Sequence, residues 1–99
     1  MDLDAMMAQA RELQSRVAAA QDNLGKINVK GIAGNGAVIV DMTAKYDVVD
    51  VIISDAAMKN GAKDLSKIVR DAFIDAKAKA DAIIDKTMAD ATHGVDLPF

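Results

Sequence analysis

Apolar residues recur at alternating steps of three and four over the first part of the chain, which is the spacing of an amphipathic helix. The apolar positions are Leu3, Met6, Ala10, Leu13, Val17, Ala20 and Leu24. This spacing is the seam of a coiled coil. The pattern predicts one helix from Met1 to about Leu24, closed by Gly25 in the left-handed conformation that often ends helices.

This predicted helix is long for a chain of 99 residues. At about 1.5 Å per residue it measures about 36 Å, whereas a compact domain of this size has a radius of gyration of about 13 Å. We therefore expect the seam to extend beyond the chain's own core and to pack against a second copy. The alternative is that the whole seam packs on the chain's own sheet.

After the helix, apolar and polar residues alternate with a period of two, and this pattern predicts three strands. Their ranges are Ile27–Lys30, Ala37–Thr43 and Tyr46–Ile53. Residues 31–36 form a glycine-rich connector, in which Asn35 and Gly36 are a strong hairpin signal. Ala44 and Lys45 make the second turn, with weak turn chemistry.

The predicted strands carry apolar residues on both faces. One face holds Val38, Val40 and Met42 with Val49, Val51 and Ile53, and the opposite face holds Ile39, Val48 and Ile52. A sheet with one face in water is normally more polar on that face. We therefore expect a helix or another chain to cover part of the second face.

A second long helix is predicted from about Asp64 to about Ala91, after a loop or short helical turn at Ser54–Ala62. Its apolar stripe has the i, i+3, i+4 spacing of a helix that packs on a core. The stripe is Leu65, Ile68, Val69, Ala72, Phe73, Ala76, Ala80, Ile83 and Ile84. His93 and Gly94 are expected to end this helix.

The order of these elements predicts an α+β fold, α-β-β-β-α, with a three-stranded antiparallel sheet and two long helices in a single domain of residues 1–99. Hydrophobic residues make up 52% of the chain and aromatic residues only 3%, so the core must be aliphatic. There is no cysteine, which excludes disulfides and thiolate metal sites. No apolar run is long enough to cross a membrane, and the acidic start, Met1 to Asp4, lacks the pattern of a secretory signal. We expect a cytoplasmic protein.

Few residues could carry out chemistry. His93 is the single histidine and has no serine or cysteine at a recognisable spacing. The glycines between the first two strands do not precede a helix, as a phosphate-binding loop requires; turn geometry and close backbone approach explain them better. Carboxylates four residues apart, Asp71 with Asp75 and Asp81 with Asp85, could bind a hard cation, but pairing with nearby lysines is the favoured interpretation. We predict no catalytic site, no metal, no cofactor and no small-molecule substrate.

Basic residues gather on one side of the second long helix. At about 100° per residue they fall within an arc of about 80°, provided that the helix begins as early as Lys59. They are Lys59, Lys63, Lys67, Arg70 and Lys77. Such a stripe could contact nucleic-acid phosphates, although the chain is acidic overall, with a net charge of −3 and a pI near 4.9. The alternative is an ordinary solvated face with ion pairs along the helix.

Several segments resemble the YbaB/EbfC nucleoid-associated proteins. They are Met6–Ala10 with the rest of the first helix to Leu24, Val29–Gly36, Val38–Val40, the pair Val51 and Ile53, Leu65–Ala76, and Leu97–Phe99. The resemblance implies an intertwined, tweezer-like homodimer that binds double-stranded DNA with little sequence specificity, coats the nucleoid and influences gene expression. It also implies that basic residues on the helices meet the DNA backbone.

We accordingly assign two sets of residues. Besides the stripe, Arg11, Arg16, Lys26 and Lys30 are candidates for phosphate contact. The predicted dimer interface is Leu3, Met6, Ala10, Leu13, Val17, Ile39 and Ile52.

The chain departs from the family at some positions. Ala44-Lys45 stands where an Asn-Gly turn is frequent, Val49-Asp50 where arginines are frequent, and Ile74 where an asparagine is usual. Together with the acidic sheet region, these changes leave a second hypothesis open, an acidic protein-interaction module that pairs with a related family member or a basic partner.

Overall fold

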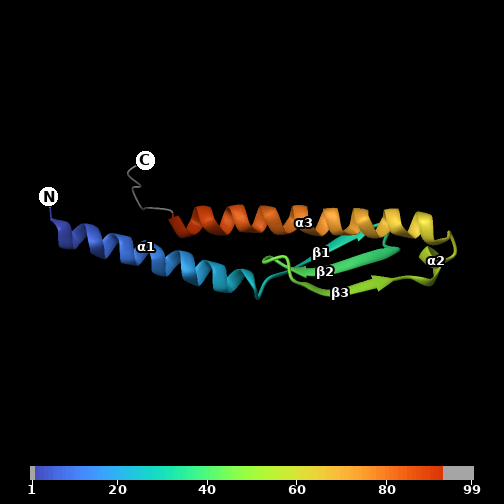
Figure 1. Cartoon of the computed structure of the whole chain (residues 1–99), viewed down its shortest axis with the longest axis horizontal. Coiled ribbons are helices and arrows are strands. Elements are labelled where there is room, and N and C mark those ends of the chain that lie inside the picture. Colours follow the sequence, from blue (N-terminus) through green and yellow to red (C-terminus); the bar gives the residue numbers. More distant parts are fainter. Residues whose placement is uncertain (1, 93–99) are drawn as a thin grey trace.

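The computed structural model describes residues 2–92 and shows two long helices joined by a small sheet (Figure 1). The elements are α1 (Leu3–Leu24), β1 (Asn28–Ala33), β2 (Val38–Thr43), β3 (Val48–Ile53), α2 (Asp55–Met58) and α3 (Ala62–Thr92). The predicted α+β fold is confirmed, with α2 as the short helical turn expected before the last helix. The molecule is elongated, with extents of 68 × 22 × 16 Å.

Helix α1 begins at a side-chain cap and ends in an ordinary turn. Asp2 Oδ1 accepts a hydrogen bond from the backbone N–H of Asp4 at 3.1 Å, which satisfies one of the free donors of the first turn. Gly25 has φ −67° and is therefore right-handed, so the predicted left-handed cap was wrong. The helix ends instead with hydrogen bonds that span three residues, from Lys26 N–H to the Asn23 carbonyl at 2.9 Å and from Ile27 N–H to the Leu24 carbonyl at 3.3 Å.

The sheet is antiparallel, with the strand order β1-β2-β3. The first turn has the predicted chemistry, because Asn35 and Gly36 have φ values of 57° and 88°, as a type I′ hairpin turn requires. Strand β1 is longer than predicted and continues through residues 31–33, which were expected to form a connector. Gly31 belongs to the strand because it pairs with Val40.

The core lies between α3 and the inner face of β1 and β2. Val38 and Val40 are fully buried and Met42 is nearly so, which confirms the predicted face of β2. They pack with Val29 and with Ala72, Ala76 and Ala80 of α3. At Gly31 the helix comes so close that an added Cβ would lie 1.9 Å from the Ala72 carbonyl oxygen. This confirms close backbone approach as one reason for the glycines.

Strand β3 lies apart from α3, and all six of its residues are exposed. The register places Ile39 opposite Ile52 on the outer face. A shift between Asp41 and Met42 pairs Met42 with Val48 and leaves Val49 as an extra residue. The prediction that Val48 shares the face of Ile52 was wrong, because a bulge changes the alternation of side chains along its strand.

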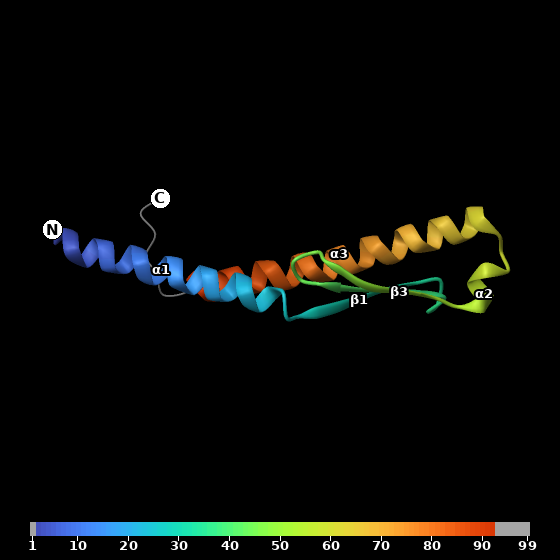
Figure 2. The ribbon, with the colours of Figure 1, turned by 60° about the horizontal axis from the view of Figure 1, so that its bottom comes forward.

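The first half of α1 extends beyond α3 and forms an arm (Figures 1 and 2). Only Ala20 and Leu24 of the seam are buried, while Leu3 is 68% and Met6 49% exposed. The packed part of α1 lies against α3, so the alternative that the whole seam packs on the sheet was wrong. Within residues 2–92, a large part of the seam has no cover from the same chain.

Candidate nucleic-acid interface

The basic stripe lies on the first half of α3, on the side turned away from the sheet. Ala72, Ala76 and Ala80 face the sheet. At about 100° per residue, the stripe residues that belong to α3 point roughly 100° to 180° away from Ala76. They are Lys63, Lys67, Arg70 and Lys77, and all are exposed.

Lys59 does not belong to this stripe. It is the C-cap of α2, and Gly61, with φ 89°, separates it from the start of α3 at Ala62. The condition attached to the prediction, a helix that begins as early as Lys59, is therefore not met. A glycine with positive φ breaks the chain direction between the two helices, which the spacing of lysines alone could not reveal.

The cations of the stripe differ in how free they are to meet a phosphate. Within residues 2–92, Lys63 and Lys67 form no ion pair. Arg70 lies 3.6 Å from Asp71, and both side chains are largely exposed, so water and salt weaken that pair. Lys77 lies 3.1 Å from Asp81 Oδ2.

Tyr46 joins the pair of Lys77 and Asp81. Its hydroxyl donates a hydrogen bond to Asp81 Oδ1, and Lys77 Nζ lies 5.8 Å from the centre of the Tyr46 ring. These contacts lower the pKa of Asp81, chiefly through the Tyr46 hydroxyl and then through Lys77. The hydrogen bond to Asp81 raises the pKa of Tyr46. Asp81 therefore stays ionised and keeps Lys77 close.

Sequence reasoning missed this cluster. Tyr46 has φ 69°, an unusual conformation for a residue other than glycine. Its N–H donates to the Thr43 carbonyl at 2.9 Å, which closes the turn. The weak turn chemistry at Ala44 and Lys45 was the only signal that another group had to hold this turn in place.

The remaining predicted cations lie elsewhere. Arg11 lies on the α1 arm, and Arg16 lies further along α1, where it pairs with Glu12 at 2.7 Å. Lys30 is exposed on β1, opposite Asp41, and Lys26 follows the end of α1. The structure therefore does not bring these four residues together with the stripe on a single chain.

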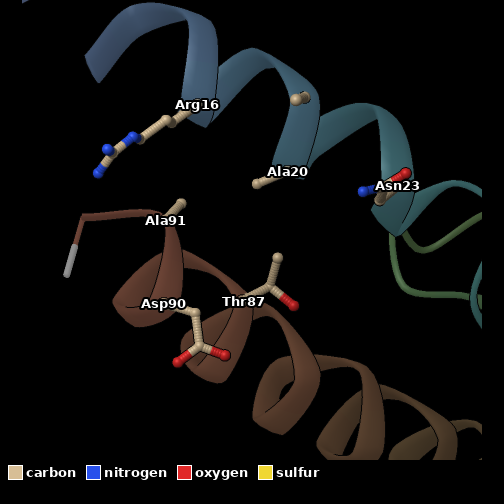
Figure 3. Close-up of a pocket in the computed structure, with 7 residues that line it drawn as sticks. Arg16, Ala20, Asn23, Thr87, Asp90 and Ala91 are labelled. Atoms are coloured by element: carbon tan, nitrogen blue, oxygen red, sulfur yellow. The ribbon is translucent and has the colours of Figure 1, made fainter. Parts of the chain in front are cut away.

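A shallow groove separates α1 from the last turns of α3 (Figure 3). It has a volume of about 460 Å³ and is lined by Arg16, Ala19, Ala20, Asn23, Thr87, Asp90 and Ala91. Small-molecule sites are usually enclosed and mostly apolar, with a few convergent polar groups. This groove is open, so it does not resemble such a site.

The sheet side of the molecule is acidic. Asp41 on β2 is directly opposite Asp50 on β3, and Asp47 and Asp55 lie at either end of β3. Asp41 Oδ1 is buried without a hydrogen-bond partner among the described residues. Negative charges repel a phosphate backbone, so the sheet side is the less favourable face for contact with nucleic acid.

Metal and membrane features are not found in the described chain. No three histidine, cysteine, aspartate or glutamate residues among 2–92 are placed to hold a metal ion. Asp71, Asp75 and Asp81 each lie beside a basic side chain, as the ion-pair interpretation expects. No helix within this part combines the length and apolar character needed to span a bilayer. His93 lies outside the described residues.

Comparison with known proteins gives a consistent result. Residues 1–95 match the YbaB/EbfC DNA-binding family. The chain is 42% identical to a nucleoid-associated protein of Bradyrhizobium diazoefficiens and 38% identical to one of Gluconobacter oxydans, each over 98% of this chain and 92% of the relative. The crystal structure of the uncharacterized protein HP0035 from Helicobacter pylori shares the fold, with a TM-score of 0.79 at 16% identity over 95% of this chain and 99% of that one. The chain belongs to the YbaB/EbfC family of DNA-binding proteins.

Proposed function

We propose that this protein binds double-stranded DNA as a homodimer, with little sequence specificity, in the cytoplasm on the nucleoid, and thereby influences gene expression. The observation that carries the proposal is the pair of lysines without an ion pair, Lys63 and Lys67, beside Arg70 on the outward side of α3 in the described chain. Curated relatives named as nucleoid-associated proteins support it.

The stripe suits contact with phosphates and not with bases. Lys63 and Arg70 are seven residues apart, so their backbones lie about 10.5 Å apart along the helix axis. Lysine acts on phosphate as a flexible point charge, and contacts to phosphate fix position without reading sequence. No aromatic residue lies among Lys63, Lys67 and Arg70, so stacking on single-stranded bases does not contribute.

Uncovered apolar surface supports self-association. In the predicted interface Leu3 is 68%, Met6 49% and Ile52 52% exposed. Ala10 is also exposed, whereas Leu13, Val17 and Ile39 are half-buried. A chain of this size is only modestly stable alone, and a second copy would remove this surface from water.

The acidic interaction module is the less favoured hypothesis. The acidic sheet side is compatible with a basic partner. The curated relatives, however, match this chain over 92% of their own length and are named nucleoid-associated proteins. A pull-down from extract with and without nuclease distinguishes the two hypotheses. Partners that persist after nuclease treatment would support the module.

The test of DNA binding is a titration at several salt concentrations. The double variant Lys63→Ala/Lys67→Ala should bind more weakly, and removing one phosphate-binding cation should reduce the slope of log affinity against log salt by about 0.9. Lys45→Ala/Lys86→Ala removes the same charge outside the stripe and is the matched control. Equal weakening in the two double variants would show that net charge alone matters and would refute the stripe.

A further inference from the structure

Two of the four asparagines in the chain precede a glycine, and the structure holds these two pairs in different surroundings. Asn35-Gly36 lies in the hairpin turn between β1 and β2. Asn60-Gly61 lies in the turn between α2 and α3, at the end of the molecule opposite the arm (Figure 1). Because glycine has no side chain, its backbone nitrogen is poorly shielded. The side-chain carbonyl carbon of the preceding asparagine can reach that nitrogen if the backbone between them turns.

The hairpin holds Asn35 in a fixed conformation. The two strands pair directly beyond the turn, and the Ala37 N–H donates to the Gly34 carbonyl at 3.2 Å. Asn35 itself is left-handed, with φ 57°. Turning its backbone toward the nitrogen of Gly36 would therefore break the hairpin geometry.

The turn that contains Asn60 is held more loosely. The Gly61 N–H donates to the Met58 carbonyl at 3.4 Å and the Lys59 N–H to the Ala56 carbonyl at 3.3 Å, both long for backbone hydrogen bonds. Asn60 is exposed, and its side chain forms no hydrogen bond within residues 2–92. Exposed turns of this kind open more readily than paired strands, so the backbone of Asn60 can turn without loss of the fold.

Positive charge surrounds Asn60. Lys59 precedes it and Lys63 follows one turn later, and neither lysine forms an ion pair within the described part of the chain. Gly61 lies at the N-terminus of α3, where its carbonyl accepts a hydrogen bond from the Leu65 N–H at 3.0 Å. A helix dipole places partial positive charge at this end. The surroundings therefore stabilise negative charge on the Gly61 nitrogen and on a carboxylate at position 60.

We propose that Asn60 is a site of spontaneous deamidation and that the carboxylate formed there withdraws Lys63 from the basic stripe. The Gly61 nitrogen gives its proton to a base in the solvent and attacks Cγ of Asn60. The new N–Cγ bond closes a cyclic imide while the Cγ–Nδ2 bond breaks, and Nδ2 takes a proton from water and leaves as ammonia. Water then adds to one imide carbonyl and opens the ring to aspartate or isoaspartate. Water is the only co-reactant, and nothing is oxidised or reduced.

The consequence for the stripe rests on the DNA binding proposed above. A carboxylate at position 60 lies within a turn of Lys63, much as Asp81 lies one turn from Lys77. It would attract a lysine that is otherwise without an ion pair in residues 2–92, and it would also repel phosphate. The stripe would lose a phosphate contact as the protein ages, at a rate set by the turn between α2 and α3.

Peptide mass mapping tests the site, with Asn35 as the internal control. The native protein is kept at mildly alkaline pH in water enriched in heavy oxygen, which labels each new carboxylate. Asn60 should take up label at least about tenfold faster than Asn35, because the hairpin must open before Asn35 can react. In urea, where neither turn is held, the two sites should react at similar rates. Equal rates in the native protein, or no label at position 60, would overturn the site.

A salt-varied DNA titration tests the consequence, with Asn60→Asp and the control Asn35→Asp. Both variants add the same charge, and aspartate tolerates the left-handed conformation at position 35. Asn60→Asp should reduce the slope of log affinity against log salt by up to about 0.9, the value of one phosphate contact, and Asn35→Asp should leave it unchanged. Equal slopes in the two variants, with a wild type that binds, overturn the withdrawal of Lys63 alone. A wild type that does not bind DNA overturns the proposed function, and the mass mapping still decides the site.

Discussion

Single residues set the distance between α3 and the sheet. Gly31 is the clearest case, because its missing side chain leaves room for the backbone of the helix at Ala72 and Ala76. Tyr46 holds a left-handed turn through Asp81, which in turn holds Lys77. The Asp81 carboxylate therefore holds the turn at Tyr46 and also reduces the positive charge that Lys77 can offer to a phosphate.

Gly31→Ala should strongly destabilise the fold. The new Cβ would meet the Ala72 carbonyl and the Ala76 N–H, which are backbone atoms and cannot rotate away. Overpacking typically costs about 1–3 kcal/mol, and we expect at least that decrease in the free energy of unfolding in urea. Gly25→Ala is the control, because its φ is −67° and its Cβ would have no neighbour closer than 3.5 Å. Equal stability of the two variants would contradict the close approach.

Asp81→Asn should strengthen DNA binding. The change removes the carboxylate that keeps Lys77 close, so Lys77 can reach a phosphate and the salt slope should steepen by about 0.9 for that contact. Asp85→Asn alters the net charge equally without a described contact to Lys77. A salt-varied titration in which the slope steepens equally in both variants would show that Asp81 does not compete for Lys77.

At the scale of elements, the spacing of apolar residues along the chain was enough to predict where the helices and strands lie. The helices and strands followed from apolar spacing at Val38, Val40 and Met42 and along the seam, because burial of one face depends on that spacing. The bulge at Val49 and the break before α3 were not predicted, since they depend on pairing and on the φ of Gly61. The bond from Ile32 to Asp75 joins residues 43 apart, and no local pattern reveals it.

The junction of α3 with β1 should weaken in acid. The Ile32 N–H and then Lys79 lower the pKa of Asp75 from its ordinary value of 3.8. A carboxylate with a lowered pKa contributes stability above its ordinary pKa and loses it as pH falls through the folded value. Wild type should therefore exceed Asp75→Asn in urea stability at pH 7, and the difference should shrink below about pH 4. A gap that stays constant down to about pH 2 would mean that the charge of Asp75 does not stabilise the junction.

At the scale of the whole molecule, the closed β1 edge should limit assembly. Asp75 accepts a hydrogen bond from the Ile32 N–H at 2.9 Å, and Lys79 donates one to the Lys30 carbonyl at 2.7 Å. Asp75→Ala/Lys79→Ala frees these two backbone groups, and unpaired backbone groups at a sheet edge can pair with another chain. We expect the molar mass of this double variant in light scattering to rise with concentration beyond two chains. Asp71→Ala/Lys86→Ala makes the same charge change away from β1 and should stay dimeric. If the first double variant also stays dimeric, Asp75 and Lys79 do not protect the edge.

Helix α3 packs against both the sheet and the second half of α1. Its 31 residues form a single helix, about 46 Å long at 1.5 Å per residue. The lysines near its start and the groove beside α1 near its end therefore belong to the same continuous helix. A reorientation of α3 on binding at Lys63 and Lys67 would therefore also displace the end of the helix that packs against α1.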